Sequence, residues 1–411
     1  MNTFTWLFLI ALVLSLVLKL WLSHRQISHV TRHRPQVPDE FAGRIPLHEH
    51  QKAADYTTTN SRFGRFSLII DTLLLIGWTL GGGLQFLHNL WSGLSGSPIM
   101  TGIAFIVSAF MLMGLLDLPA TLYHTFVIEE RFGFNKMTVP TFFSDLLKQT
   151  ALTLAFGVPL AWVALTLMDK AGSLWWLYLW AVWMGFSLLM MWAYPAFIAP
   201  LFNKFTPLED DALKNRIQTL LTKCGFTSQG IFVMDGSRRS GHGNAYFTGM
   251  GNNKRIVFFD TLLESLDEDE IEAVLAHELG HFKRKHIVKR IFSMMVISLA
   301  GLALLGWLTQ QDWFFNGLGA QTTSNAMALM LFLLVSPVFT LFMQPISAWF
   351  SRKQEFEADD YAASQSDASK LIQALVKLYK ENASTLTPDP LYSAFYDSHP
   401  PAPVRIAHLS G

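Results

Sequence analysis

The chain has 411 residues, of which 51% are apolar and only 15% charged, with 31 basic and 31 acidic side chains. Soluble domains carry about 25% charged residues, so this composition excludes a disordered chain and indicates a membrane protein. The zero net charge argues against a nucleic-acid partner, which requires a basic surplus to neutralise phosphates. The single cysteine, Cys224, excludes an intrachain disulfide and a cysteine-based metal site.

Seven segments are long and apolar enough to cross a bilayer as helices. In chain order they are 4–22, 66–90, 100–126, 150–168, 174–199, 291–308 and 326–350. The first lacks a basic n-region and a cleavage site, so we expect a retained span and not a signal peptide. Several spans contain polar residues such as Asp71 and Asp117, which are costly at membrane depth unless they face protein or water. These residues favour a wet interior.

The distribution of Lys and Arg in the loops predicts the orientation of the chain. The basic loops are 23–65, 127–149 and 200–290, and the loops without Lys or Arg are 91–99 and 309–325. Because basic and bare loops alternate, we expect a multi-pass integral membrane protein with its N-terminus outside the cell. The C-terminus and the regions 23–65, 200–290 and 351–411 are then cytosolic, which requires an odd number of spans.

The region 200–290 is the largest segment outside the predicted spans. Its pattern predicts a helix over 209–224 and strands over Ile231–Met234, Asn244–Thr248 and Arg255–Phe259. Between the last two strands lies a group of residues typical of a hairpin turn, Gly249, Gly251, Asn252 and Asn253. A second helix is expected to begin near Ser265, because Glu268 three residues later completes a capping-box pattern.

This second helix contains the sequence His277-Glu278-Leu-Gly-His281. On a helix, residues i and i+4 share one face, so both imidazoles can bind one Zn²⁺. Glu278 lies beside them and can take a proton from a metal-bound water, whose pKa zinc lowers to about 7. The motif therefore predicts one zinc ion per chain and a hydrolytic reaction.

A hydrolytic zinc site needs a third protein ligand and one open position. After His281 the chain crosses the membrane twice and returns to the same face, where it emerges into the segment Ser351–Asp359. A helical hairpin of this kind brings Glu355 to the membrane level of His281, so we predict Glu355 as the third ligand. Asp359, one turn later, can hold a ligating imidazole or donate a proton. The alternative for both carboxylates is a solvated helix, which is what we expect for Glu357.

At these residues the chain resembles the type-I CAAX prenyl protease family, the membrane-embedded zinc metallopeptidases of the Ste-twenty-four type. Similar segments outside the zinc helix are Phe126–Thr138, Pro195–Pro207, Asn244–Gly249, Ser351–Asp359 and Ser398–Arg405. The resemblance implies an all-α membrane fold in which seven helices form a barrel around a large chamber. A cytosolic zinc-metallopeptidase domain with a small β-sheet completes this fold.

Two regions are expected in such a chain. The N-terminal transmembrane region, 1–199, holds five spans and the cytosolic loops 23–65 and 127–149. The zinc metallopeptidase region, 200–411, holds the spans 291–308 and 326–350 and the cytosolic tail.

The resemblance also implies roles for residues outside the zinc motif. Asn244 and Ala245 match an edge strand that pairs with an extended peptide substrate, although an ordinary buried strand is the alternative. His399 and Arg405 match a C-terminal motif, where His399 would stabilise the oxyanion and Arg405 would bind substrate, or both would anchor the tail. His286 lies off the ligand face of a continued helix, so we expect it at the membrane interface.

We therefore predict a membrane zinc endopeptidase whose partners are the lipid bilayer and a peptide substrate, with no nucleic acid. Family members remove the last three residues of prenylated CaaX peptides. Short inserts and a tail, Ala407–Gly411, without a basic or retrieval signal favour a bacterial inner membrane over the endoplasmic reticulum. In a host without prenylated proteins, the substrate would not be a CaaX peptide.

Two other functions are compatible with parts of the sequence. A site-two-type intramembrane protease would place H-E-x-x-H inside a span, which the charges at 267–270 and 283–285 disfavour. A channel, transporter or quality-control scaffold would use zinc only structurally, and structural sites are normally closed by four protein ligands.

Overall fold

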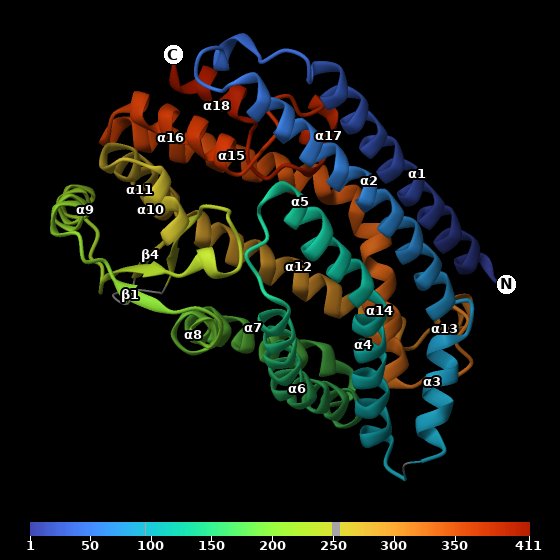
Figure 1. Ribbon diagram of the computed structural model, residues 1–411. Helices are drawn as coiled ribbons and strands as arrows, with labels where there is room; N and C mark the ends of the chain where they lie inside the picture. The colour runs from blue at the N-terminus through green and yellow to red at the C-terminus, as the bar shows by residue number, and fades with distance from the viewer. Residues whose placement is uncertain (95, 249–254) are drawn as a thin grey trace.

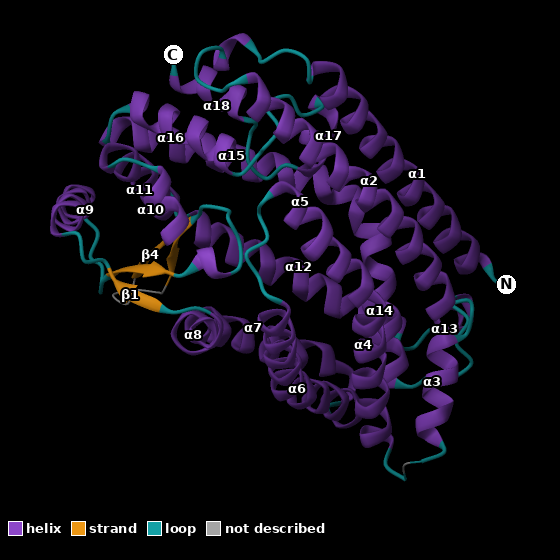
Figure 2. Cartoon of the chain, in the orientation of Figure 1, coloured by secondary structure: helices purple, strands orange, loops and turns teal. Residues whose placement is uncertain are grey.

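The computed structural model describes residues 1–94, 96–248 and 255–411, and the chain is mainly helical (Figure 2). Within these residues, six helical segments are each long and apolar enough to cross a membrane, and a bent pair makes a seventh. The helices that form these spans are α1 (Thr3–His33), α2 (Leu47–Trp78), α3 (Gly83–Ser92), α4 (Pro98–Tyr123), α6 (Val139–Lys170), α7 (Trp175–Ala193), α12 (His286–Leu308), α14 (Asn325–Thr340) and α15 (Gln344–Gln365). The bent pair is α2 and α3, whose axes meet at 46°.

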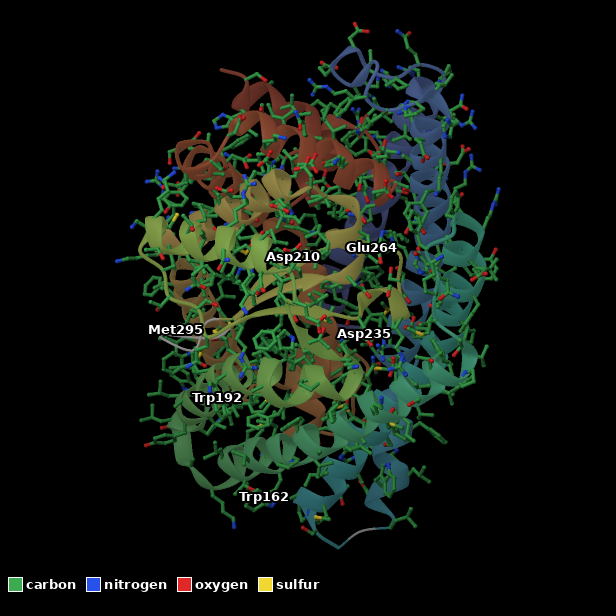
Figure 3. All side chains as sticks on the ribbon, turned by 60° about the vertical axis from the view of Figure 1, so that its left-hand side comes forward. Trp162, Trp192, Asp210, Asp235, Glu264 and Met295 are labelled. Carbon is green, nitrogen blue, oxygen red and sulfur yellow. The ribbon has the colours of Figure 1, made fainter. Side chains whose placement is uncertain are left out.

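Shorter helices end two of the spans (α5 and α8), connect others or build the region outside them. They are α5 (Glu130–Phe132), α8 (Ala199–Phe202), α9 (Asp211–Cys224), α10 (Asp260–Ser265), α11 (Glu268–Lys283), α13 (Asp312–Gly317), α16 (Ala368–Glu381), α17 (Pro390–Tyr396) and α18 (Ala402–Leu409). Figure 1 shows that α11, α15, α16 and α18 gather at the end of the molecule opposite α3 and α6. In Figure 3, Asp210 and Glu264 lie near the middle of the view, above Trp192 of α7 and Trp162 of α6.

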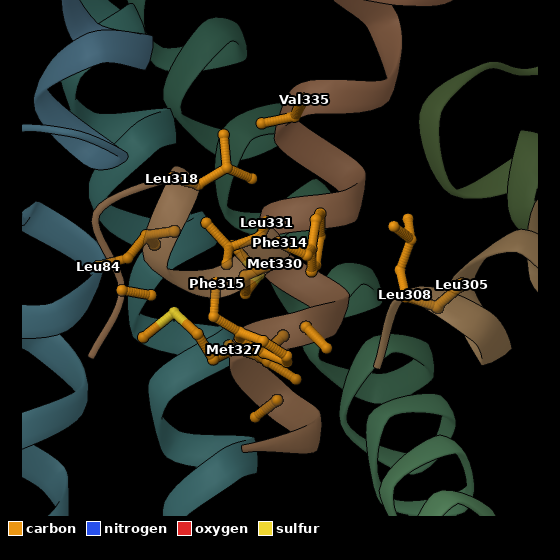
Figure 4. Close-up of a cluster of buried hydrophobic side chains, with 14 of the residues drawn as sticks. Leu84, Leu305, Leu308, Phe314, Phe315, Leu318, Met327, Met330, Leu331 and Val335 are labelled. Atoms are coloured by element: carbon orange, nitrogen blue, oxygen red, sulfur yellow. The ribbon is translucent and has the colours of Figure 1, made fainter. Parts of the chain in front are cut away.

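Helix α14 forms the centre of the largest apolar core. Its Met327, Met330 and Leu331 are fully buried and pack with Phe314 and Phe315 of α13 (Figure 4). The outer faces of the spans carry large apolar side chains that remain exposed, as lipid-facing surfaces do; on α1 they are Trp6, Leu7, Ile10, Val13, Leu14, Val17 and Trp21. The spans therefore bury one apolar stripe among themselves and present another outward.

The spans form a barrel around an interior space, as predicted. A cavity of 890 Å³ lies between α2 and α4, and Leu334 of α14 also lines it. Asp71 and Asp117 both face this cavity.

A small four-stranded mixed sheet lies beside α8 and α9 (Figure 1). Its strands are β1 (Phe205–Pro207), β2 (Ile231–Met234), β3 (Ala245–Thr248) and β4 (Arg255–Phe259), in the spatial order β1-β2-β4-β3. β1 and β2 are antiparallel, β2 and β4 are parallel, and β3 pairs antiparallel with β4 so that Ala245 lies opposite Phe258. The predicted pairing of β3 with β4 is confirmed, whereas the turn predicted at Gly249, Gly251, Asn252 and Asn253 lies outside the described residues. β3 is an edge strand.

The helix α11 begins two residues later than the sequence predicts. Its N-cap is Asp267, whose side chain accepts a hydrogen bond from the backbone N–H of Glu270 at 2.9 Å. Glu270 in turn accepts from the backbone N–H of Asp267 at 2.8 Å, which completes a capping box. Ser265 instead ends the short helix α10, so the predicted capping pair of Ser265 and Glu268 is wrong.

Candidate metal centre

Two packed helices, α11 and α15, bring the predicted zinc ligands together. His277 and His281 lie one turn apart on α11, and Glu355 faces them from α15. Gly280 allows the close contact, because a Cβ atom at this position would lie 2.9 Å from the Cα of Ala358. A side chain there would push the two helices apart, so the glycine within the motif helps to set the ligand geometry.

The distances among the three side chains fit a zinc ion. Nε2 of His277 lies 3.3 Å from Nε2 of His281 and 3.5 Å from Oε2 of Glu355. Oε1 of Glu355 lies 3.3 Å from Nε2 of His281. Tetrahedral zinc with bond lengths of about 2.0–2.1 Å holds its ligand atoms about 3.3 Å apart. All three separations are near this value.

Glu355 gives a second indication of a cation. Its side chain is only 5% exposed, and its Oε2 is buried with no hydrogen-bond partner. A buried carboxylate oxygen without a partner is costly, and a metal ion at the centre of the three side chains would satisfy it. Among the described residues, the cluster contains three ligands and no fourth, which fits a hydrolytic site better than a closed structural one.

The second ring nitrogen of His277 is held by a buried ion pair. Nδ1 of His277 lies 2.8 Å from Oδ1 of Asp359, whose side chain is fully buried. Nε of Arg405 donates to Oδ2 of Asp359 at 2.8 Å, and Nη2 of Arg405 lies 3.3 Å from Nδ1 of His277. The geometry agrees with the prediction that Asp359 can hold a ligating imidazole. Arg405 contacts this pair and is 7% exposed.

The electrostatic setting on α11 suits hydrolysis. Burial raises the pKa of the Glu278 carboxyl above its usual range. A raised pKa brings the carboxyl closer to neutral pH, where a group can both accept and return a proton. Burial, followed by the neighbouring His277, lowers the pKa of His281 to about 4. Its imidazole is therefore neutral, which is the form that binds a metal.

His399 lies on the open side of the cluster. Its Nε2 is 3.5 Å from Oε1 of Glu355, and its side chain is 66% exposed. Ser398 Oγ lies 3.0 Å from the other ring nitrogen, Nδ1. The residue can therefore reach both the cluster and a molecule that approaches from solvent.

The strand β3 lies beside the helix that carries the histidines. Phe247 of β3 packs edge-on against Phe282 of α11, with ring centroids 5.3 Å apart. Asn244, just before the strand, is exposed, and its side-chain oxygen accepts from the backbone N–H of Ala245 at 2.8 Å. Because β3 is the outermost strand beyond β4, one of its edges is not covered by another strand of the described sheet.

The sequence does not predict the contacts that His286 and Glu357 make. His286 is 4% exposed, and its Nδ1 lies 2.9 Å from Nδ1 of His281. Its Nε2 lies 3.0 Å from Oε2 of Glu357, which is therefore partnered and not simply solvated. The prediction treats α11 as continuous through residue 286, but the helix ends at Lys283 and Lys285 has a φ of 58°. In the sequence, the only indication of the contact between His286 and His281 is that His286 lies close to the H-E-x-x-H motif.

Comparisons with known proteins agree with this geometry. A family model described as the CAAX prenyl protease N-terminal region with five membrane helices matches residues 26–204, and the model of peptidase family M48 matches residues 207–411. The chain is 37% identical to CAAX prenyl protease 1 of Saccharomyces cerevisiae over 329 residues, 76% of this chain and 73% of that protein. It is 36% identical over 390 residues to the CAAX prenyl protease 1 homolog of Arabidopsis thaliana, covering 92% of this chain and 91% of that protein.

A solved structure extends the similarity to three dimensions. The crystal structure of S. mikatae Ste24p superposes with a TM-score of 0.93 at 32% sequence identity, covering 100% of this chain and 99% of that one. The matched regions include the spans, the sheet and both helices of the metal centre. The chain is therefore a multi-pass integral membrane protein that belongs to peptidase family M48.

Proposed function

We propose that this protein is a membrane zinc endopeptidase that processes the C-termini of CAAX-type peptides. The observation that carries the proposal is the near-tetrahedral spacing of His277, His281 and Glu355, with no fourth protein ligand among the described residues. Glu278 follows His277 directly on α11. This arrangement suits a metal that must leave one position open for reactants.

One zinc ion per chain would be held by Nε2 of His277, Nε2 of His281 and the carboxylate of Glu355. When bound, zinc supplies Lewis acidity that polarises a peptide carbonyl and lowers the pKa of water. Glu278 would take a proton from the attacking water and return it to the leaving amine nitrogen. Asp359 would keep the proton of His277 on Nδ1, so that Nε2 stays free to bind metal.

The residues on the open side would bind and orient the peptide. His399 would donate a hydrogen bond to the oxyanion that develops on the scissile carbonyl. Asn244 and Ala245 would pair with an extended substrate through the free edge of β3, since main-chain hydrogen bonds hold a peptide largely independently of its sequence. For Arg405, the buried contacts with Asp359 and His277 favour anchoring of the tail over direct substrate binding.

The substrate class follows from the relatives. The proteins of S. cerevisiae and A. thaliana are named CAAX prenyl protease 1 or its homolog. We infer a peptide substrate with a C-terminal CaaX sequence, which carries a prenyl group in hosts that make one. The chemistry at the metal centre does not depend on the prenyl group.

We further propose that the N-terminus lies outside and the metal centre lies on the cytosolic side. The alternation of basic and bare loops supports this orientation. The division into a transmembrane region, 1–199, and a zinc metallopeptidase region, 200–411, stays a prediction. The prediction of a bacterial inner membrane rests on the short inserts, although the relatives named above are eukaryotic.

The structure disfavours the other two functions. A site-two-type protease would carry the motif inside a span, whereas α11 is not among the candidate spans of the described residues. A scaffold with structural zinc would not need an acidic side chain beside an open metal position.

Mass spectrometry of cleavage products tests the proposal. The purified protein is incubated with zinc and either a prenylated CaaX peptide or its unprenylated twin. We expect release of the last three residues, with faster release from the prenylated peptide. Protein that binds zinc but cleaves neither peptide would contradict the proposed function, and equal rates would show that the lipid is tolerated and not recognised.

A further inference from the structure

A series of side-chain contacts ends on the second predicted zinc ligand, His281. Nδ1 of His286 lies 2.9 Å from Nδ1 of His281, and Nε2 of His286 lies 3.0 Å from Oε2 of Glu357. Lys289 Nζ approaches the same Glu357 oxygen at 3.4 Å. His286 is 4% exposed, so protein and not water surrounds its ring.

One arrangement of protons suits both the metal and these contacts. Nε2 of His281 faces the metal centre and must be unprotonated there, so its proton lies on Nδ1. His281 then donates to Nδ1 of His286. Because Nδ1 of His286 accepts in this arrangement, its proton lies on Nε2, where it is donated to the carboxylate of Glu357. In this arrangement each ring nitrogen of His281 and His286 meets a partner of the complementary type, a donor facing an acceptor or the metal.

We propose that His286 is a positioning residue for His281, and that Glu357 orients His286 in turn. The proposal rests on the zinc site of the proposed function. It gives His281 the support that Asp359 gives His277, where a carboxylate oxygen lies 2.8 Å from Nδ1. Partners of this kind fix the tautomer and ring orientation of a metal-binding histidine and make its free nitrogen more basic.

The backbone at Lys285 places His286 in reach of His281. On a continuous helix, a residue five positions later would lie about 140° around the axis from His281. Lys285 instead takes the left-handed conformation, with φ 58° and ψ 33°, between the end of α11 and the start of α12. This conformation is unfavourable for a residue with a side chain, and it turns the chain so that His286 points back at the ligand.

The positions of the carboxylates on α15 explain why Glu357 acts on His281 through His286 and not directly. Glu355 and Asp359 are four residues apart and share the face that meets α11. Glu357 lies about 160° around the helix from Glu355, so it does not share this face. His286, at the start of α12, spans the distance between Glu357 and His281.

Zinc affinity measures the positioning role without using activity. The purified full-length protein in detergent is titrated with a chelator of known zinc affinity. We expect His286→Leu, which keeps an apolar side chain but removes the acceptor, to weaken zinc binding by about 10–100-fold. His286→Asn keeps an oxygen acceptor near the position of Nδ1 and should retain most of the affinity. Glu357→Ala should lie between the two.

A matched control comes from another histidine–carboxylate pair, whose carboxylate, Asp360, lies on α15 as Glu357 does. His408 Nε2 lies 2.7 Å from Oδ1 of Asp360, and this pair does not contact the three ligands. His408→Leu should leave zinc affinity unchanged. The visible spectrum of the cobalt-loaded protein gives a second readout, and it should change in His286→Leu but not in His408→Leu.

The outcomes separate this proposal from the function on which it rests. Failure of the wild-type protein to bind zinc would remove the proposed function itself. Wild-type zinc affinity in folded His286→Leu would overturn only the positioning role of His286. If His286→Leu does not fold, Glu357→Ala decides, because its side chain is 31% exposed and so lies outside the buried core. Wild-type zinc affinity in that variant would overturn the relay.

Discussion

Glu278 differs from the neighbouring histidines in its proposed role. It accepts and returns a proton, whereas the histidines bind the metal. Glu278→Gln keeps the shape of the side chain but removes the base, so we expect kcat to fall by about 10²–10⁴-fold. Zinc stoichiometry should stay at one per chain. The matched control is Glu272→Gln on the same helix, which loses an ion pair with Arg216 and should keep its activity. Wild-type cleavage by a zinc-loaded Glu278→Gln protein would exclude Glu278 as the base.

At the residue scale, the structure brings the three predicted ligands together, whereas the sequence predicts only part of what surrounds them. His277, His281 and Glu355 could be found because helical spacing and the return of the chain to one membrane face both constrain them. Asp359 could be found for the same reason, one turn from Glu355. His286 could not, because its placement depends on a left-handed backbone at Lys285, a residue type that gives no sign of it.

At the element scale, the contact between α11 and α15 decides whether the three ligands meet. Gly280→Ala would place a methyl group 2.9 Å from the Cα and 3.0 Å from the carbonyl oxygen of Ala358. Because both atoms belong to the backbone, α15 must move. We expect a loss of about 1–3 kcal/mol of stability and weaker zinc binding, measured by thermal melting and chelator competition.

Gly185→Ala in α7 is the matched control for this substitution, because a Cβ at Gly185 meets nothing within 4 Å. It should leave zinc affinity unchanged. If Gly280→Ala melts and binds zinc like the wild type, close packing of the two helices does not set the site.

Helices and strands could be predicted from the sequence where a single local pattern is strong. The spans follow from long apolar runs, and β2 and β4 have the bounds expected from their sequence. β1 and α10 were missed because three to six residues carry too weak a pattern. The parallel pairing of β2 with β4 could not be predicted from the local sequence either, because it depends on the path of the chain between the two strands.

At the scale of the whole molecule, the charge distribution predicts a definite orientation in the bilayer. Cysteines introduced at Arg44 and Asp312, both exposed, should react with a membrane-impermeant maleimide from opposite sides. The native Cys224 is buried and can be replaced by Ala to give a clean background. We expect labelling of intact cells at Asp312→Cys and protection at Arg44→Cys until the membrane is opened. The reverse pattern would invert the orientation.

The barrel and the metal centre depend on each other, because α12 and the segment α14–α15 carry the chain away from the zinc helix and back to it. The most direct test of this account is peptide cleavage by protein stripped of metal with a chelator and then titrated with Zn²⁺. We predict that activity is lost on stripping and returns in full when one zinc ion per chain has been added. Cleavage that persists in protein shown to be free of zinc would contradict the account.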